Sequence, residues 1–267
     1  NLTGINQARF MIRSSRTGSN IKIGLHNAYD SYTKLCSHFD GADGATAYSD
    51  PIAGAATFVG NAQLDTSDKK FGTASLLLDG NGDYITYPDS DNYSFGTGDF
   101  TVDFWVKFAD TNIDGVMISQ CSEWSPQNYW WIKYYETTDK LQIAFAVGGV
   151  GKGIYNVNSF IPSTSNWYHF AFEWTGTTGK IFINGVSQTL EEEAAFGSND
   201  VGNVGAVLQI GALYGGQYFK GWIDEVRISK GIARWTDNFT PPTAPYALVA
   251  EVTPNIIEAN KFQEAKI

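Results

Sequence analysis

Apolar and polar side chains alternate with a period of two residues along much of this chain. The clearest example is the stretch 100–108. One face of it carries only apolar side chains, which are Phe100, Val102, Phe104, Val106 and Phe108. Such alternation predicts a β-strand in a sheet that is buried on one side.

Further apolar runs, separated by turns rich in Gly, Asp and Asn, predict more strands. They cover residues 115–120, 129–135, 141–147, 167–174, 180–183, 207–210 and 220–229. Asn184-Gly185 is typical of a two-residue hairpin turn. So many short strands predict an all-β fold, a sandwich of two antiparallel sheets. Residues 190–196 fit either one helical turn or an acidic loop.

The pattern divides the chain into segments 1–33, 34–246 and 247–267. Two short strands at 8–13 and 21–25 predict an N-terminal β-hairpin, which is an arm or the end of a preceding domain. A lone hairpin is marginally stable in water, so we expect it to pack against something. After a stiff proline-rich stretch, residues 247–267 are expected to be a linker or an arm.

The amino-acid composition limits the classes of partner that the protein can bind. The 267 residues include 28 Asp and Glu against 18 Lys and Arg, a net charge of −10. This acidity argues against nucleic acid, whose phosphates need a basic surface. No apolar run is long enough to insert into a membrane. Cys36 and Cys121 fit either two buried free thiols or one disulfide.

Several stretches occur in a characteristic order. They are His38–Gly41, Phe71-Gly72, Leu78–Gly80, Asp83-Tyr84, Asp99–Val106, Trp167–Phe170, Ile183–Gly185, Ile210-Gly211 and Gly221–Ile228. Together they resemble the laminin G/pentraxin-like group of the concanavalin A-like lectin and glucanase superfamily, across residues 33–246. The resemblance implies a jelly-roll sandwich. The segment from Arg234 to Pro242 resembles the ends of such modules in bacterial surface and phage virion proteins, which implies an extracellular, cell-surface or virion location.

Asp224 is a candidate metal ligand. Alternation over 220–229 places it on one face with Trp222, Val226 and Ile228, and a buried carboxylate needs a cation, an Arg or backbone N–H groups as a partner. The resemblance implies a structural calcium ion held by Asp224, Asp40 and Gly80. A hydrogen-bonded Asp224 without metal is the alternative.

An aromatic cluster provides the candidate ligand-binding residues. In the strand 129–135, Tyr129, Trp131 and Tyr135 share one face with Lys133, and Trp124 precedes them in the chain. Aromatic rings on an open face can stack on sugar rings. The alternative is that loops or a protein partner cover them.

Catalytic acids are not evident in the sequence. Sugar-cleaving relatives place Glu-x-Asp-x-x-Glu on one strand so that two carboxyl groups flank the glycosidic bond, and this chain has no such spacing. We therefore expect a non-catalytic recognition or structural module of an extracellular or virion-surface assembly, acting in adhesion. Its expected partners are other protein subunits and glycans. The alternatives are a carbohydrate-binding lectin-like domain and a polysaccharide hydrolase of the glucanase type.

Overall fold

The structure is a computed structural model that describes residues 22–121, 128–148, 150–176, 178–197, 200, 202–246 and 249–256. The chain forms two compact units. One unit is the sandwich, residues 31–247, and the other combines residues 1–30 with 248–267. Each unit is described by itself below.

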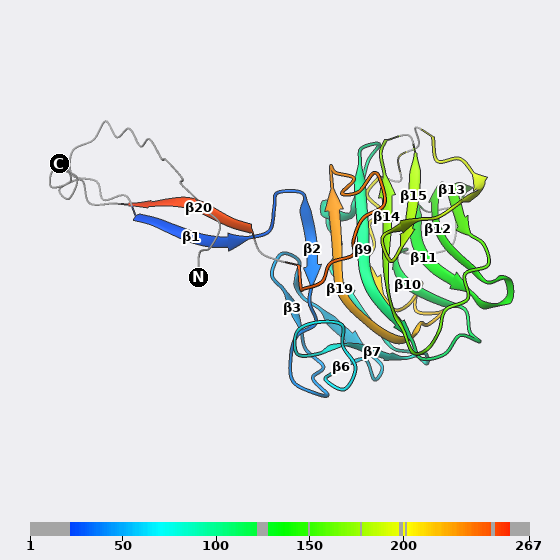
Figure 1. The fold of residues 1–267 in the computed structure, drawn as a ribbon, viewed down its shortest axis with the longest axis horizontal. Helices are drawn as coiled ribbons and strands as arrows, with labels where there is room; N and C mark the ends of the chain where they lie inside the picture. Colours follow the sequence, from blue (N-terminus) through cyan, green and yellow to red (C-terminus); the bar gives the residue numbers. More distant parts are fainter. Residues whose placement is uncertain are drawn as a thin grey trace. The chain divides into compact units, whose positions relative to one another are not determined.

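In the smaller unit, strand β1 (Lys22–Ala28) pairs antiparallel with β20 (Val249–Ile256) (Figure 1). The expected strand at 21–25 therefore has a partner from the other end of the chain. Its expected hairpin partner, residues 8–13, lies outside the described residues. The two ends of the chain thus form one antiparallel ribbon.

The sandwich consists of two antiparallel sheets, as the sequence predicts. The first, which we call the β9 sheet, has its strands in the order β16 (Val186–Ser187), β15 (Gly179–Ile183), β14 (Trp167–Trp174), β9 (Phe100–Phe108), β19 (Lys220–Lys230), β7 (Ser75–Asp79) and β6 (Gln63–Asp65). Strand β2 (Thr33–Ser37) also pairs with β19.

The second sheet, which we call the β11 sheet, contains the predicted aromatic cluster. Its strands are, in order, β17 (Glu191–Ala194), β13 (Val150–Val157), β12 (Lys140–Val147), β11 (Tyr129–Tyr135), β10 (Gly115–Gln120), β18 (Leu208–Ile210), β8 (Tyr84–Tyr87) and β5 (Thr57–Val59). A separate ribbon pairs β3 (Ser49–Asp50) with β4 (Gly54–Ala55).

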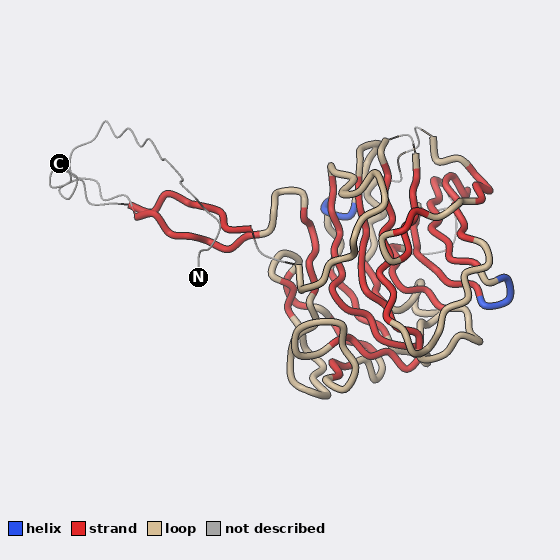
Figure 2. Tube along the Cα trace, in the orientation of Figure 1, coloured by secondary structure: helices blue, strands red, loops and turns tan. Residues whose placement is uncertain are grey.

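Strands and turns make up almost all of the described chain (Figure 2). The described helices are two short 3-10 turns, Asp91–Tyr93 and Glu136–Thr138. Neither is long or apolar enough to cross a membrane. Residues 191–194, expected as a helical turn or loop, instead form edge strand β17 because their backbone pairs with β13.

The core between the sheets is filled by the alternating apolar faces. The five apolar side chains of β9 belong to it and are at most 2% exposed. Leu208 and Ile210 of β18 and Trp130 of β11 pack in the same core. Cys36 and Cys121 are both buried and do not form a disulfide, which settles the alternative left by the sequence.

Strand β9 is buried on both faces, which its alternation alone did not predict. Its second face carries Thr101, Asp103 and Trp105, and each is at most 5% exposed. The cover is the segment 231–246, which we call the exit segment. Gly185 lets it approach closely, because a Cβ there would lie 1.9 Å from the carbonyl oxygen of Phe239.

Strand β19 contains a β-bulge that corrects the predicted alternation. Its register against β9 shifts between Asp224 and Arg227, and Glu225 has a left-handed backbone (φ +51°). As a result Ile223, Val226 and Ile228 all reach the core. Asp224 therefore does not share a face with Val226 and Ile228, because the extra residue of the bulge reverses the alternation.

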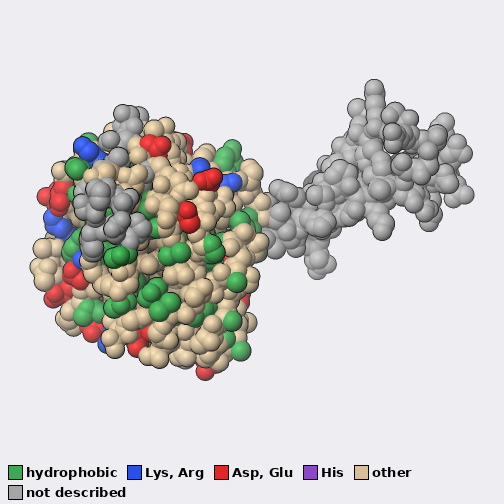
Figure 3. Space-filling model, turned by 180° about the vertical axis from the view of Figure 1, so that it is seen from behind, with side chains coloured by type: hydrophobic (Ala, Val, Ile, Leu, Met, Phe, Trp, Pro, Cys, Tyr) green, Lys and Arg blue, Asp and Glu red, His purple; other side chains and the backbone are tan. Residues whose placement is uncertain are grey.

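The molecular surface has no continuous basic patch on the face that Figure 3 shows, as far as its described residues go. Lys and Arg side chains there are few and lie mostly toward the margins, among Asp and Glu. The net charge of −10 is thus not offset by a local basic region on this face.

Candidate functional site

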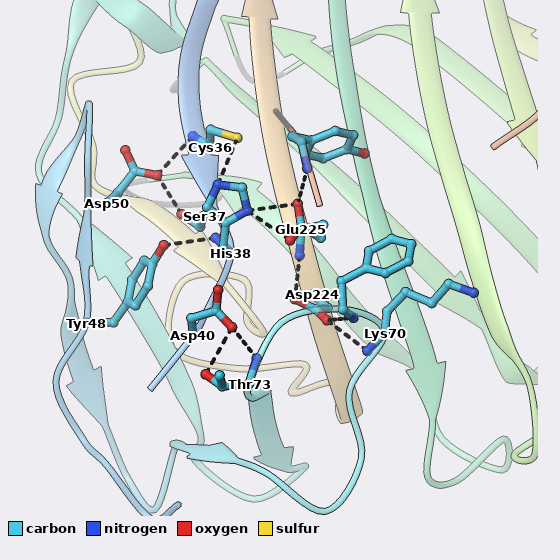
Figure 4. Close-up of polar contacts among 12 residues, drawn as sticks. Cys36, Ser37, His38, Asp40, Tyr48, Asp50, Lys70, Thr73, Asp224 and Glu225 are labelled. Atoms are coloured by element: carbon cyan, nitrogen blue, oxygen red, sulfur yellow. Dashed lines mark hydrogen bonds and ion pairs between the residues drawn. The ribbon is translucent and has the colours of Figure 1, made fainter. Parts of the chain in front are cut away.

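The carboxylate of Asp224 is fully buried and is held by backbone N–H groups (Figure 4). Its Oδ2 accepts hydrogen bonds from the amides of Lys70 at 2.8 Å and Phe71 at 3.1 Å. Its Oδ1 accepts one from the amide of Glu225 at 2.8 Å. Backbone donors are thus the observed partners of the carboxylate whose partner the sequence left open.

The other two predicted calcium ligands are placed differently. Asp40 is exposed and accepts a hydrogen bond from the Thr73 hydroxyl at 3.1 Å (Figure 4). Gly80 lies beside Lys220, whose neighbour in register is Asp79. Because Lys220 and Asp224 are four residues apart on β19, Gly80 is about 13 Å from Asp224, at roughly 3.3 Å per residue.

Gly80 is thus separated from Asp224, whereas the carboxylates of Asp40 and Asp224 both accept hydrogen bonds from the backbone of residues 70–73. Among the described residues, no three His, Cys, Asp or Glu side chains gather as a metal site would require. Calcium binding stays a prediction, and thermal melts with and without a chelator will test it, because a bound ion raises the melting temperature by mass action.

A buried polar layer lies between the β9 sheet and the exit segment. At its centre, the fully buried Asp103 accepts hydrogen bonds from Arg227 Nε at 3.0 Å and Arg227 Nη2 at 2.9 Å. The hydroxyl of Tyr246 also donates to Asp103, and His169 Nε2 lies 3.2 Å from that hydroxyl. Against the effect of burial, the charge of Arg227 holds the pKa of Asp103 well below its ordinary value.

Glu173 lies in the same layer, but its pKa is shifted in the opposite direction from that of Asp103. Its Oε2 accepts hydrogen bonds from Thr101 Oγ1 at 2.6 Å and the amide of Arg234 at 2.9 Å, whereas its buried Oε1 has no partner. Burial, with a smaller contribution from the negative charge of Asp103, raises the pKa of Glu173 to about 8. Burial therefore favours the neutral form of Glu173 more strongly than that of an exposed glutamate.

His38, Cys36 and Glu225 form a second polar group beside this layer (Figure 4). Glu225 accepts from His38 Nδ1 at 2.8 Å and from the amide of Tyr246 at 2.9 Å. His38 Nε2 lies 4.0 Å from the sulfur of Cys36. The order Cys–His–Glu resembles a nucleophilic triad, but the thiol is fully buried, so a substrate has no access to it.

These shifts predict that the protein is more stable in mild acid than in mild alkali. Burial raises the pKa of Asp224 and of Glu173 to about 8, and the hydrogen bond to Glu225 raises the pKa of His38. A raised pKa contributes stability below the ordinary value, and this contribution is lost as the pH rises through the raised pKa.

We therefore expect the melting temperature to fall between pH 6 and pH 9. The fall is about 2–4 °C for each kcal/mol by which the free energy of unfolding decreases. Scanning calorimetry across that range will measure it. Glu173→Gln should flatten part of the fall. A melting temperature that rises steadily to pH 9 would contradict the assignment. Asp103 has a lowered pKa, so it affects stability only below about pH 4.

The predicted aromatic cluster forms a stack along β11, on the side of the β11 sheet away from the core. The rings of Tyr129 and Trp131 are stacked, with centroids 4.8 Å apart and planes 12° apart. Next along the strand, Lys133 Nζ lies 3.8 Å from the centroid of Tyr135 and 2.9 Å from Asp114 Oδ2. We call Tyr129, Trp131, Lys133 and Tyr135 the β11 stack.

Polar side chains from neighbouring strands extend the β11 stack across the sheet. Gln142 Oε1 accepts hydrogen bonds from the Trp131 indole and the Tyr135 hydroxyl, both at 3.2 Å. Gln142 Nε2 donates to Asn156 at 2.8 Å, and Asn156 donates to Glu193 at 2.8 Å. Trp131 and Tyr135 are half-buried, whereas Tyr129, Lys133, Gln142 and Asn156 are at most 9% exposed. Two accessible rings beside oriented hydrogen-bonding groups suit a ligand that is part apolar and part hydroxylated.

Small side chains of β12 lie opposite two rings of the stack. Across the register of β12, Trp131 faces Ala144 and Tyr129 faces Ala146. Trp124, the fourth predicted ligand-binding residue, lies outside the described residues. Alternation already places Lys133 on this face with Tyr129 and Trp131, although the sequence did not suggest it as a ligand-binding residue. Gln142 and Asn156 were not predicted as members of this face, because they come from other strands.

Comparison with known proteins defines the family. The model of the concanavalin A-like lectin/glucanases superfamily matches residues 79–235 of this chain, more than half of its length. The chain belongs to this superfamily. Within the superfamily sandwich, the matched region includes both β9 and β11. No functionally curated protein matches the sequence.

Solved structures share the fold of this superfamily member. Domain 4 of AbnA, a GH43 extracellular arabinanase from Geobacillus stearothermophilus in complex with arabinotriose, is 21% identical with a TM-score of 0.58, over 80% of this chain and 95% of that one. The botulinum neurotoxin serotype D ligand binding domain in complex with N-acetylneuraminic acid is 17% identical with a TM-score of 0.55, over 76% and 48%.

A third similar structure is the binding domain of Paraclostridial Mosquitocidal Protein 1, which is 14% identical with a TM-score of 0.53, over 75% of this chain and 49% of that chain. The present chain therefore spans about half the length of these two toxin domains. At such identities the likeness concerns the fold alone.

Proposed function

We propose that this chain is a non-catalytic glycan-binding module of an extracellular or surface-located protein. The β11 stack is the observation that carries the proposal. Its half-buried rings, Trp131 and Tyr135, are oriented by Gln142 and Lys133 and lie beside the small side chains of β12. Apolar ring surface next to oriented donors and acceptors is the combination that a sugar requires, because sugars have C–H faces and hydroxyl rims.

The similar structures support this class of ligand without fixing its identity. The arabinanase domain was solved with arabinotriose and the serotype D toxin domain with N-acetylneuraminic acid. One is a neutral oligosaccharide and the other an acidic sugar, so both belong in the first set of probes for the present chain.

The placement of acidic residues supports a non-catalytic role. Glycoside hydrolysis needs two carboxyl groups that flank a bound sugar. Asp103 and Glu173, two neighbouring carboxyl groups with opposed pKa shifts, are 0% and 3% exposed under the exit segment. Near the β11 stack, Glu191 and Glu193 both bind Lys140, at 2.9 Å and 3.3 Å.

A glycan array with the purified full chain tests this function. We expect binding to at least one class of neutral or acidic oligosaccharide, and no release of reducing sugar from the bound glycans. An array without any bound glycan would overturn the binding function. Release of reducing sugar that depends on a single Asp or Glu would overturn the non-catalytic one.

Attachment to a larger surface assembly, as in adhesion or a virion, is a second part of the proposal. It is supported by the ribbon of β1 and β20, because a two-stranded ribbon alone is marginally stable in water and gains stability from a further partner. Light scattering of the full chain and of residues 31–247 tests it. We expect the full chain to self-associate or to bind other protein subunits. Two monomers of equal stability would contradict this.

A further inference from the structure

A hollow of about 530 Å³ lies on the outer side of the β9 sheet, away from the β11 stack. It is lined by Lys70, Phe71, Trp105, Trp167, Asn184 and the exit-segment residues 240–243. Its volume is within the range of small-molecule sites, about 300–1,000 Å³. It lies on the opposite sheet from the β11 stack, so a ligand here does not depend on the function proposed for that stack.

Lys70 places a positive charge in this hollow, and the nearby carboxyl group of Asp224 is not in ion-pair contact with it. Its Nζ lies 3.8 Å from the centroid of Trp105 and 5.6 Å from that of Phe71. Within the described part of the chain, no carboxylate is in ion-pair contact with it. Burial lowers the pKa of Lys70 despite the charge of Asp224. An ammonium group in such surroundings is stabilised by an incoming anion.

The backbone of Lys70 is anchored beside the hollow. The buried carboxylate of Asp224 accepts hydrogen bonds from the amides of both Lys70 and Phe71. The bulge in β19 therefore affects the hollow, because it directs the side chain of Asp224 toward the backbone of Lys70.

Aromatic groups form the walls around Lys70. The indole N–H of Trp167 donates to Asp68 Oδ1 at 3.0 Å, which fixes the ring, and the other oxygen of Asp68 is neutralised by Lys107. Trp105 is only 5% exposed, and its buried indole N–H has no hydrogen-bond partner. An unpaired buried donor is costly, so it favours a ligand with an acceptor.

We propose that this hollow binds a sugar that carries a carboxylate, such as a uronic or a sialic acid residue. The carboxylate pairs with the ammonium of Lys70, and the apolar face of the sugar ring lies against the Trp and Pro walls. A neutral sugar of the same size lacks the charge interaction. The proposed site is therefore selective for acidic over neutral sugars, and its affinity decreases with salt.

Binding measurements on the full chain test this proposal. The probes are N-acetylneuraminic acid, galacturonic acid and, as the neutral match, galactose, each titrated by ligand-observed NMR at low and high salt. We expect at least one acid to bind about tenfold or more tightly than galactose at low salt. Equal binding of acids and galactose, or no binding of either acid, would overturn the proposal.

Variants locate the site. Lys70→Met keeps the aliphatic stem and should weaken binding of the acid at least tenfold, whereas Lys70→Arg keeps the charge and should retain most of it. Lys69→Met is the matched control, because Lys69 is an exposed neighbour whose ammonium binds the Thr66 carbonyl, and it should bind normally.

Trp131→Ala separates this proposal from the proposed function. It removes a ring from the β11 stack on the other sheet and should leave binding of the acid at Lys70 unchanged. Binding of the acid that is lost in Trp131→Ala and retained in Lys70→Met would assign the acid to the β11 stack and overturn the site at Lys70.

Discussion

Replacing Arg227 by methionine is expected to destabilise the sandwich by about 3–5 kcal/mol, because it leaves the carboxylate of Asp103 buried without its charge partner. Asp103 is fully buried and accepts two hydrogen bonds from the Arg227 guanidinium. The guanidinium also lies 4.0 Å from the ring centroid of Tyr246, a contact that holds the exit segment on the β9 sheet. Denaturant unfolding at pH 7 measures the loss.

Two controls separate the buried charge from lost packing. The double variant Asp103→Asn/Arg227→Met removes both charges and should recover a large part of the loss, because no unpaired charge then remains. Lys107→Met breaks an ion pair whose side chains are 17% and 24% exposed, and it should cost at most about 1 kcal/mol. If the double variant is as unstable as Arg227→Met, the unpaired charge is not the cause.

Replacing Trp131 by alanine is expected to weaken glycan binding at the β11 stack about tenfold or more, with a smaller effect on folding. The ring is half-buried, stacks on Tyr129 and donates to Gln142, so its loss removes both apolar contact and the orientation of Gln142. A tenfold loss corresponds to about 1.4 kcal/mol, within the range that a single aromatic contact residue contributes to binding. Titration with the glycan that the array identifies measures it.

The controls for this prediction test whether the ring face or the fold is responsible. Trp131→Phe keeps an aromatic ring and should bind with intermediate affinity. Tyr32→Ala removes a ring that is 45% exposed and remote in sequence, and it should bind as the unchanged chain does. Unchanged affinity in Trp131→Ala, with the fold intact by circular dichroism, would mean that the glycan binds elsewhere.

The sequence by itself determined the strands of the sandwich and the faces of the regular ones. The boundaries expected for 100–108, 115–120, 129–135 and 167–174 are those of β9, β10, β11 and β14. Alternation also placed Tyr129, Trp131 and Tyr135 together. These results are local, because the pleat of a strand places every second side chain on the same face regardless of the rest of the chain.

Only the tertiary structure decided what covers each face and which distant groups meet. The second face of β9 looks solvent-exposed in sequence, yet the exit segment buries it more than a hundred residues later in the chain. Gln142 and Asn156 join the β11 stack through the register of three strands, and β1 finds its partner in β20. Such pairings depend on contacts between residues far apart in sequence.

The bulge in β19 had the greatest influence on the candidate sites. One extra residue around Glu225 reverses the alternation, so Val226 faces the core and Asp224 meets the amides of Lys70 and Phe71. No residue type in this stretch marks the bulge, since Glu rather than Gly takes the left-handed backbone. It is stabilised by packing on one side and hydrogen bonds on the other, and both exist only once the sheet has formed.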